Sequence, residues 1–332
     1  MLHRLALQTL VLFVVFSLSA CAQHSRFQYT PAAIELDTLV PTLRFMVIGD
    51  WGRNGENHQT EVGDMMDYFS LKYKAQFIVS TGDNFYNNGV TDVQDPLWKS
   101  SFESIYAGKG LQIPWYVVLG NHDHRGSPAA EMAYHTLSPR WNLPGHYYAK
   151  HFLIGGKDSA QLVFFDSSPL VKEYWKQPAT YKDLIQQDTA RQLQWIDSAF
   201  SHSPCKWKIA IGHHPFYSAA LGHGNTPELI ASLKPILLKN GVQVSFAGHE
   251  HDLQHLQVKG EPLAYFISGA GSKIGFEGRN ELSLYEKAIP GFAFVSLSAN
   301  RMQVFFISYE GKLLYQTAIP VGSLPRGKIQ GN

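Results

Sequence analysis

The sequence predicts an α/β fold, because short apolar runs alternate with longer segments of helical periodicity from Leu43 onward. The short runs are rich in Val, Ile, Phe and Trp, as buried strands are. We expect strands at Leu43–Ile48, Phe77–Ser80, Trp115–Leu119, Leu162–Phe165, Trp207–Ile211 and Val242–Ala247. We expect helices near residues 58–73, 96–106, 128–138, 188–202 and 226–240. Thr226-Pro227-Glu228 is a typical helix start, with an N-cap residue, a proline at the first position and an acid in the first turn.

The last third of the chain has a different pattern, in which apolar runs follow one another across short turns. These runs are Leu263–Ser268, Gly291–Ser298, Arg301–Ser308 and Lys312–Ala318. They predict an antiparallel meander that completes a second sheet.

Composition restricts the class of protein. The chain has 332 residues and is 45% hydrophobic, as globular proteins are. Its 28 basic and 27 acidic residues leave a net charge of 28 − 27 = +1. A near-neutral chain gives no electrostatic reason to expect binding to nucleic acid. One catalytic domain over residues 41–320 is the simplest organisation, followed by a tail at 321–332.

The N-terminus is typical of an export signal. Basic residues precede an apolar run from Leu5 to Leu18 that is too short for a membrane span, so we expect a signal peptide over residues 1–20. Leu18-Ser19-Ala20-Cys21 resembles a bacterial lipobox, in which the Cys is lipidated after cleavage. We therefore expect an exported protein, periplasmic or on the cell surface, tethered by residues 21–40. The alternative is ordinary signal cleavage nearby, with Cys21 incidental.

Five of the predicted strands end in Gly followed by a potential metal ligand. The ligands are Asp50 in GDWG, Asp83 in GDNFY, Asn121 in GNHD, His213 in GHHP, and His249 and His251 in GHEH. Each motif alone is usually a turn or a polar loop. Because ligands bind beyond the carboxyl ends of strands in α/β sheets, the five together predict a metal site.

These motifs, in this order, resemble the purple acid phosphatases of the calcineurin-like metallophosphoesterase superfamily, and the single-domain tartrate-resistant type in particular. The similarity covers roughly residues 43–310 and includes DNFYNNGVTDVQDPLW and the tract from GNHDH to SPRWNLP. Tyr86 separates this group from other dinuclear metallophosphatases, which lack a Tyr ligand. The resemblance implies a four-layer αββα sandwich of two mixed β-sheets flanked by helices.

The resemblance also implies a role for each ligand. Asp50, Tyr86 and His251 would hold Fe(III), Asn121, His213 and His249 would hold divalent Fe, Zn or Mn, and Asp83 would bridge the two ions. Phenolate and carboxylates suit a trivalent ion, whereas neutral imidazoles and an amide oxygen suit a divalent one.

The implied activity is that of an acid phosphatase, in which a metal-bound hydroxide attacks small phosphate monoesters in line. A phosphodiesterase or nucleotide hydrolase on the same site is the alternative, and a non-enzymatic metal-binding or adhesive surface protein is a third possibility. His122 and His223 match phosphate-contacting histidines, and either of them could protonate the leaving group.

The remaining residues near the motifs have simpler expected roles. We expect Phe216, Tyr217 and residues 167–182 to line the substrate pocket, and Glu250 to point away from the metals. The segment 167–182 matches in position a loop that represses the mammalian enzyme until it is cleaved, although its sequence differs. We expect structural or surface roles for His124, His135, His146, His214 and His255.

Overall fold

The computed structural model describes residue 36 and residues 42–322, which belong to one compact unit. The predicted signal peptide, Cys21, the predicted tether apart from residue 36, and the tail beyond residue 322 lie outside the described residues. Within the described part, no helix is long and apolar enough to cross a membrane.

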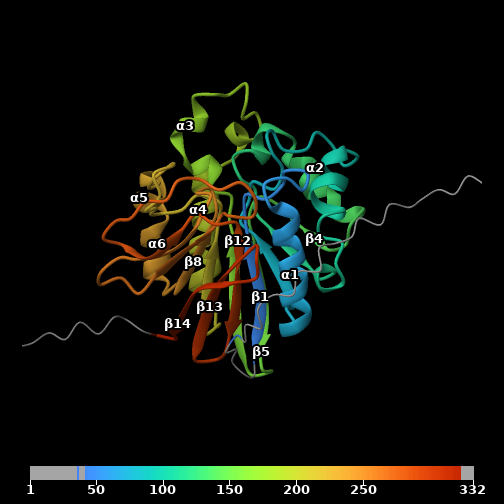
Figure 1. Cartoon of the computed structure of the whole chain (residues 1–332). Coiled ribbons are helices and arrows are strands. Elements are labelled where there is room, and N and C mark those ends of the chain that lie inside the picture. Colours follow the sequence, from blue (N-terminus) through green and yellow to red (C-terminus); the bar gives the residue numbers. More distant parts are fainter. Residues whose placement is uncertain (1–35, 37–41, 323–332) are drawn as a thin grey trace, which may run out of the picture. The chain divides into compact units, whose positions relative to one another are not determined.

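Two mixed seven-stranded sheets form the centre of the described chain (Figure 1). The first has the order β14-β13-β12-β1-β2-β3-β4. Its parallel strands are β1 (Leu43–Ile48), β2 (Phe77–Ser80), β3 (Trp115–Val117) and β4 (Trp141–Asn142), and its antiparallel strands are β12 (Gly291–Leu297), β13 (Arg301–Ser308) and β14 (Leu313–Pro320). The second has the order β11-β9-β10-β8-β7-β6-β5. Its strands are β5 (Tyr148–Ile154), β6 (Asp158–Phe164), β7 (Trp207–Ile211), β8 (Val244–Ala247), β9 (Leu253–Gln257), β10 (Ala264–Ser268) and β11 (Ser283–Lys287).

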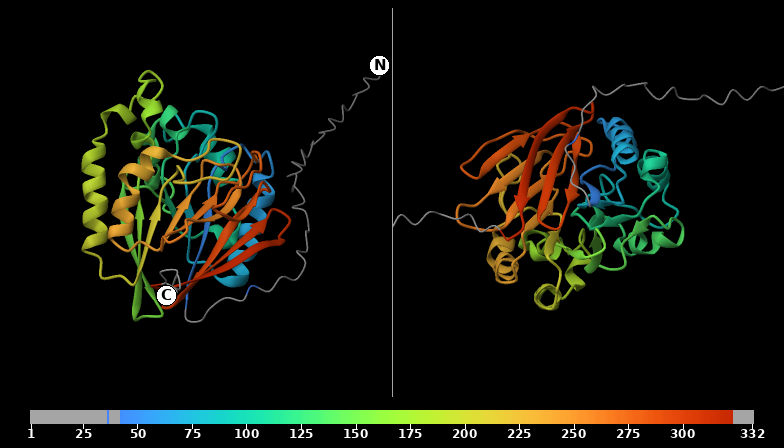
Figure 2. Two further views of the ribbon diagram at one scale, coloured as in Figure 1. Left: turned by 90° about the vertical axis from the view of Figure 1, so that its left-hand side faces the viewer. Right: turned by 90° about the horizontal axis from the view of Figure 1, so that it is seen from below.

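Helices pack against the outer face of each sheet (Figure 2). The α-helices are α1 (Gln59–Tyr73), α2 (Pro128–Ala133), α3 (Lys172–Trp175), α4 (Thr189–Ser201), α5 (Pro227–Ser232) and α6 (Lys234–Lys239). The other helical segments are the π-helix η1 (Trp98–Glu103) and the 3₁₀ turns η2 (Lys109–Leu111), η3 (Asp123–Arg125), η4 (Tyr134–Thr136), η5 (Ser168–Leu170) and η6 (Leu184–Gln186). The four-layer αββα sandwich is therefore confirmed.

The core lies in two apolar layers. Between the sheets, the ring of Phe45 stacks on Phe77 at 4.9 Å and meets the edge of Phe246 at 6.3 Å. Outside the second sheet, Ile196 and Phe200 of α4 are buried in the same cluster as the α5–α6 leucines. Because side chains pack on both faces of the second sheet, its central strands β7, β8 and β10 are largely apolar, and the sequence predicted all three.

Two expectations for the elements were wrong. The segment 263–268 does not join the C-terminal meander, because β10 pairs in parallel with β8 in the second sheet. The meander β12–β14 instead extends the first sheet beside β1. The predicted helix over residues 226–240 is two helices, since Pro235 in the first turn of α6 lacks the N–H that would continue α5.

Candidate metal centre

The loops that follow β1, β2, β3, β7 and β8 gather along one edge of the sandwich, on the upper side of Figure 1. Both sheets contribute to this edge, so residues far apart in the sequence meet there. All seven predicted metal ligands lie in these loops, and six of the seven are buried. The structure therefore brings together the whole predicted set.

One group of donor atoms surrounds the phenol oxygen of Tyr86. This oxygen lies 3.0 Å from Asp50 Oδ1, 2.9 Å from Asp83 Oδ2 and 3.1 Å from His251 Nε2. His251 Nε2 is also 3.5 Å from Asp50 Oδ1. Two carboxylates, a phenol and an imidazole thus converge on one point.

A second group surrounds His213 Nε2. This nitrogen lies 3.1 Å from Asn121 Oδ1, 3.2 Å from His249 Nδ1 and 3.5 Å from Asp83 Oδ1. The Asp83 carboxylate is therefore common to both groups, with one oxygen facing each. The backbone N–H of His122 donates to Asp83 Oδ1 at 2.8 Å and holds it in this position.

The surroundings of His213 show that its group fits a cation. His213 Nδ1 lies 2.9 Å from the carbonyl oxygen of Thr81, which only accepts, so Nδ1 carries the proton. In the neutral ring, Nε2 is then unprotonated and has a lone pair available to bind a metal ion. It faces oxygens of Asn121 and Asp83, and a cation between these three atoms would remove the repulsion between their lone pairs. A metal-bound His that donates its other N–H to a carbonyl is the usual arrangement.

Burial favours the neutral forms of several candidate ligands. Burial raises the pKa of Asp50 well above its ordinary value, and the negative charge of the neighbouring Asp83 adds to this effect. Burial also raises the pKa of the Tyr86 phenol, with Asp50 and Asp83 adding to it. Burial lowers the pKa of His213, and it lowers that of His251 to about 4, so both imidazoles are neutral. Without a nearby cation, the Asp50 carboxyl and the Tyr86 phenol would therefore stay protonated, and a bound metal ion would supply the positive charge that lets them ionise.

Backbone geometry at the site is unusual. Asp50, Asp83 and His249 have positive φ angles of 60°, 49° and 70°, in the left-handed region that such residues seldom adopt. Gly120 is required for a different reason, because a Cβ there would lie 2.1 Å from Asp83 Oδ1. Strain of this kind persists at sites where the local fold dictates the position of a ligand.

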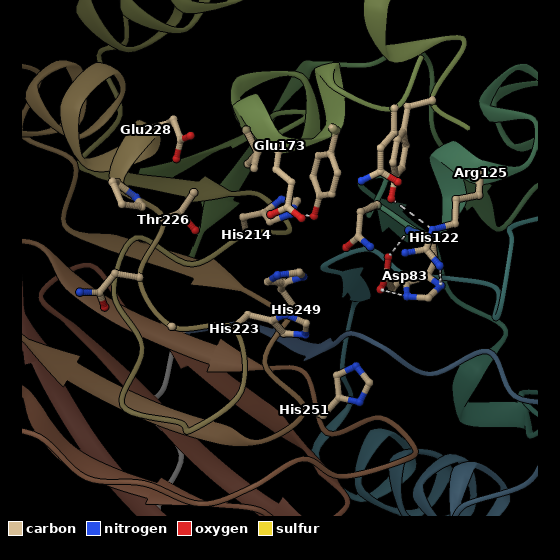
Figure 3. A pocket seen from close by; sticks show the side chains of 18 residues that line it. Asp83, His122, Arg125, Glu173, His214, His223, Thr226, Glu228, His249 and His251 are labelled. Carbon is tan, nitrogen blue, oxygen red and sulfur yellow. Dashed lines mark hydrogen bonds and ion pairs between the residues drawn. The ribbon is translucent and has the colours of Figure 1, made fainter. Parts of the chain in front are cut away.

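The two histidines predicted to be catalytic lie on opposite sides of the pocket. His122 Nδ1 is 2.5 Å from the carbonyl oxygen of Asn87, and its Nε2 is 3.9 Å from Asp83 Oδ2. The ring of His223 is exposed and stacks on His249, with centroids 4.1 Å apart. Figure 3 shows His122 beside Asp83 and His223 beside His249.

A pocket of about 380 Å³ opens above the donor groups. As predicted, residues of the segment 167–182 line it, namely Val171, Glu173, Tyr174, Gln177 and Tyr181. Phe216 and Tyr217 do not line it, contrary to expectation. Both rings pack on Tyr265, at 5.7 Å and 5.2 Å, because they follow a strand of the second sheet into its outer apolar layer.

Several residues at the site were not predicted. Arg125 lines the pocket, with Nη1 3.3 Å from His122 Nδ1 and Nε 3.2 Å from the Tyr181 hydroxyl. The buried Asp123 carboxylate accepts backbone N–H bonds from Asn84 and Gly120, and so fixes two ligand loops together. Asp123 stands inside the GNHD motif, but the sequence does not show which loops it holds.

His214 was expected to be a structural or surface residue, and it is buried in the pocket wall. Its Nδ1 lies 2.8 Å from Ser167 Oγ and its Nε2 2.7 Å from the Tyr174 hydroxyl. Both nitrogens are therefore engaged in fixing the segment 167–182.

Comparison with known proteins places this geometry in a family. The model of the calcineurin-like phosphoesterases matches residues 43–253. Purple acid phosphatase 3 of Arabidopsis thaliana is 36% identical over 288 residues, which cover 82% of this chain and 76% of that protein. Tartrate-resistant acid phosphatase type 5 of Homo sapiens is 33% identical over 312 residues, which cover 87% of this chain and 94% of that protein.

Solved structures have the same fold. GAP50, the anchor in the inner membrane complex of Plasmodium, matches with a TM-score of 0.72 and 25% identity, over 86% of this chain and 90% of its own. The purple acid phosphatase PPD1 from yellow lupin seeds matches with a TM-score of 0.62 and 13% identity, over 84% of this chain and 54% of its own. The second likeness concerns the fold alone.

Proposed function

We infer the function from the premise that this chain belongs to the purple acid phosphatases within the calcineurin-like phosphoesterase family. We propose that it hydrolyses phosphate monoesters at an Fe(III)–divalent metal pair. The protein is an acid phosphatase with a dinuclear metal centre. The identity of the two ions and the roles of the individual residues are our proposal.

In this proposal the donor group around Tyr86 holds Fe(III), and the group around His213 holds the divalent ion. The ligands of Fe(III) are Asp50, Tyr86, His251 and Asp83, and those of the divalent ion are Asn121, His213, His249 and Asp83. One observation carries the assignment: the two oxygens of Asp83 face different donor groups, one rich in anionic oxygens and one rich in neutral nitrogens. Hard anionic donors favour the trivalent ion, and imidazoles favour Fe(II), Zn or Mn.

The protein's own residues would orient and protonate the substrate. When bound, two adjacent cations neutralise the phosphoryl oxygens and lower the pKa of the attacking water. His122 contacts the Asn87 carbonyl and has its Nε2 toward Asp83, which supports a role in contacting the phosphoryl group. His223 lies at the open rim, where a leaving oxygen would depart, and it would donate the proton to that oxygen.

A phosphodiesterase or nucleotide hydrolase remains the alternative, because the leaving group is selected by the pocket wall and not by the metal ligands. Rates on an aryl phosphate and on the corresponding bis-aryl diester separate the two. We expect the monoester to be hydrolysed faster, and a faster diester reaction would favour the alternative.

Metal analysis with a visible spectrum of the purified protein tests the centre itself. We expect iron and a second metal, and a visible charge-transfer band. Asp83→Ala should lose both ions and the activity, because it removes the carboxylate shared by the two groups. Asp197→Ala, which changes a carboxylate bonded to Lys239 on an outer helix, is the matched control and should retain both. An active Asp83→Ala variant with its metals would contradict the site.

We also propose that the protein is exported and held at a membrane by lipid on Cys21. The lipobox-like Leu18-Ser19-Ala20-Cys21 after an apolar run supports this. Cys21→Ser should move the protein from the membrane fraction to the soluble fraction, and an unchanged membrane fraction would contradict the anchor.

A further inference from the structure

A second cluster of metal-ligating side chains lies apart from the seven residues of the dinuclear centre. His124 comes from η3, His146 precedes β5, and Asp166 follows β6. Asp166 Oδ2 is 2.8 Å from His124 Nε2 and 3.1 Å from His146 Nδ1. One donor atom from each residue lies within 4.8 Å of the other two, which is compact enough to close around an ion. His124 and Asp166 are fully buried, and His146 is partly exposed.

The opposite nitrogens of both imidazoles face a single outer carboxylate. Asp183 Oδ2 lies 3.4 Å from His124 Nδ1 and 3.6 Å from His146 Nε2. The two rings are parallel within 5°, so both can face Asp166 on one side and Asp183 on the other. His124 Nδ1 is buried and makes no well-aligned hydrogen bond, and Asp183 Oδ2 is the carboxylate oxygen that stands near it. Metal-bound histidines usually donate the second ring N–H to a carboxylate in this way.

A fourth donor is available beside Asp166. The amide nitrogen of Gln187 lies 3.0 Å from both Asp166 Oδ2 and Asp183 Oδ2. Rotating this amide by 180° exchanges the positions of its nitrogen and its oxygen. Which of the two atoms is which is inferred only from their hydrogen-bond partners. The amide oxygen would then complete a set of two nitrogens and two oxygens. With neutral imidazoles, the two carboxylates carry a charge that one divalent cation balances.

We propose that His124, His146 and Asp166 bind a third metal ion, a divalent ion of the zinc type, with Asp183 as its outer carboxylate. Imidazole and carboxylate donors in a four-ligand set are typical of zinc. Zinc sites in which every position is taken by the protein are structural. The site uses residues that the dinuclear centre does not, so it stands independently of the proposed function.

The position of this ion would explain how the wall of the substrate pocket is fixed. The segment that carries Asp183 and Gln187 has only a small apolar cluster of its own, made of Tyr174, Tyr181 and Leu184. Tyr174 and Tyr181 line the substrate pocket. An ion between Asp166 and this segment would tie the pocket wall to the second sheet.

The alternative is a purely ionic cluster without metal. In that case His124 is an imidazolium: burial lowers its pKa, but Asp166 and Asp183 outweigh burial and raise the pKa to about 10. The two arrangements differ in one measurable quantity, which is the number of metal ions per chain.

The metal content of the purified holoenzyme distinguishes the two arrangements. The protein is dialysed against micromolar zinc, and loosely bound metal is then removed by gel filtration. We expect three equivalents in the wild type and two in His146→Gln, with the visible band of the dinuclear centre unchanged. His135→Gln, which changes an exposed histidine outside the cluster, is the control and should keep three. Two equivalents in the wild type, or three in His146→Gln, would overturn the proposal.

Two further variants separate this site from the dinuclear centre. Asp83→Ala should still bind one zinc ion per chain, because it leaves the second cluster intact, and a variant without any zinc would contradict the independence of the site. Asp183→Asn should weaken zinc binding at the third site by roughly 10- to 100-fold, as loss of an outer carboxylate does. Competition with a chromophoric zinc chelator measures this, and unchanged affinity would contradict the role of Asp183.

Discussion

The carboxylate of Glu250 accepts a hydrogen bond from the backbone N–H of His223 at 2.9 Å. The same oxygen accepts the N–H of Gly224 at 2.6 Å. Glu250 stands between His249 and His251 in the sequence, and its side chain points to the loop at 222–224. The metal-binding loop and the loop of the proposed general acid are therefore joined through one side chain.

Glu250→Ala should lower kcat and leave the metal content unchanged. A hydrogen bond to a charged group contributes about 1.5–3 kcal/mol, so losing this bond would free the loop and cost roughly tenfold or more in rate. Because His223 is proposed to act on the leaving group, KM for an aryl phosphate should change little. Steady-state kinetics and metal analysis measure both.

The matched variant is Glu250→Gln, which keeps a carbonyl oxygen as acceptor and should retain most of the activity. If Glu250→Ala and Glu250→Gln were equally active, the carboxylate would not be positioning His223.

Tyr86→Phe should abolish the visible absorption band. The phenol oxygen lies at the centre of the first donor group, and the band is proposed to arise from charge transfer between that oxygen and Fe(III). An absorption spectrum of the iron-loaded variant is the measurement. Tyr181→Phe removes a phenol from the pocket wall outside the donor groups and should keep its colour. A coloured Tyr86→Phe variant would rule out Tyr86 as the chromophore.

The ligands were predictable because each follows a strand that is visible in the sequence. The runs at Leu43–Ile48, Phe77–Ser80 and Trp207–Ile211 became strands with the predicted bounds. These strands are buried on both faces, so their composition alone identifies them. Glycine before the ligand then marks the point where the backbone must turn closely past another loop.

Elements at the edges of the sheets were not predictable in the same way. β4 has only two residues, and β5 is partly exposed and carries Lys150 and His151. The internal strand β10 was assigned to the wrong sheet for another reason. It precedes the C-terminal meander in the sequence, which suggested that it belongs to it, but in space it pairs in parallel with β8.

The sequence predicted which segment forms the pocket wall, but not which contacts hold that segment in place. The segment 167–182 has no strong periodicity, and Tyr174 and Arg125 are placed there by bonds to His214 and Tyr181. The cluster of His124, His146 and Asp166 joins three elements from different parts of the chain. No spacing in the sequence marks such a site, so its histidines were assigned no function.

The stability of the fold should depend on pH through His255. This residue is 3% exposed in β9, its ring stacks on Phe266 at 4.3 Å, and its Nε2 has no hydrogen-bond partner. Burial lowers the pKa of His255 to about 4 from an ordinary value of 6.5. The unfolded chain therefore binds a proton here at a higher pH than the folded chain does. Stability is lost as the pH falls from the unfolded toward the folded pKa.

His255→Gln removes this titration. Between about pH 7 and about pH 4.5, the wild type should lose roughly 2 kcal/mol more unfolding free energy than the variant, at about 1.4 kcal/mol for each unit of pKa. Urea unfolding at the two pH values measures the difference. His135→Gln, at an exposed position, should follow the wild type. An equal loss in His255→Gln and in the wild type would show that His255 does not titrate with the unfolding transition.

Because we propose different roles for His122 and His223, the loss of kcat/KM in their Ala variants should depend differently on the leaving group. A general acid contributes about 10²–10⁴-fold, and it matters most when the leaving oxygen is strongly basic. His223→Ala should therefore reduce kcat/KM on an alkyl phosphate far more than on a nitrophenyl phosphate, whose leaving group needs no proton. His122→Ala should reduce both to a similar extent, because its Nε2 is fixed toward Asp83, where the phosphoryl group would lie in either substrate. The reverse pattern would make His122 the acid and leave the exposed ring of His223 to contact phosphate.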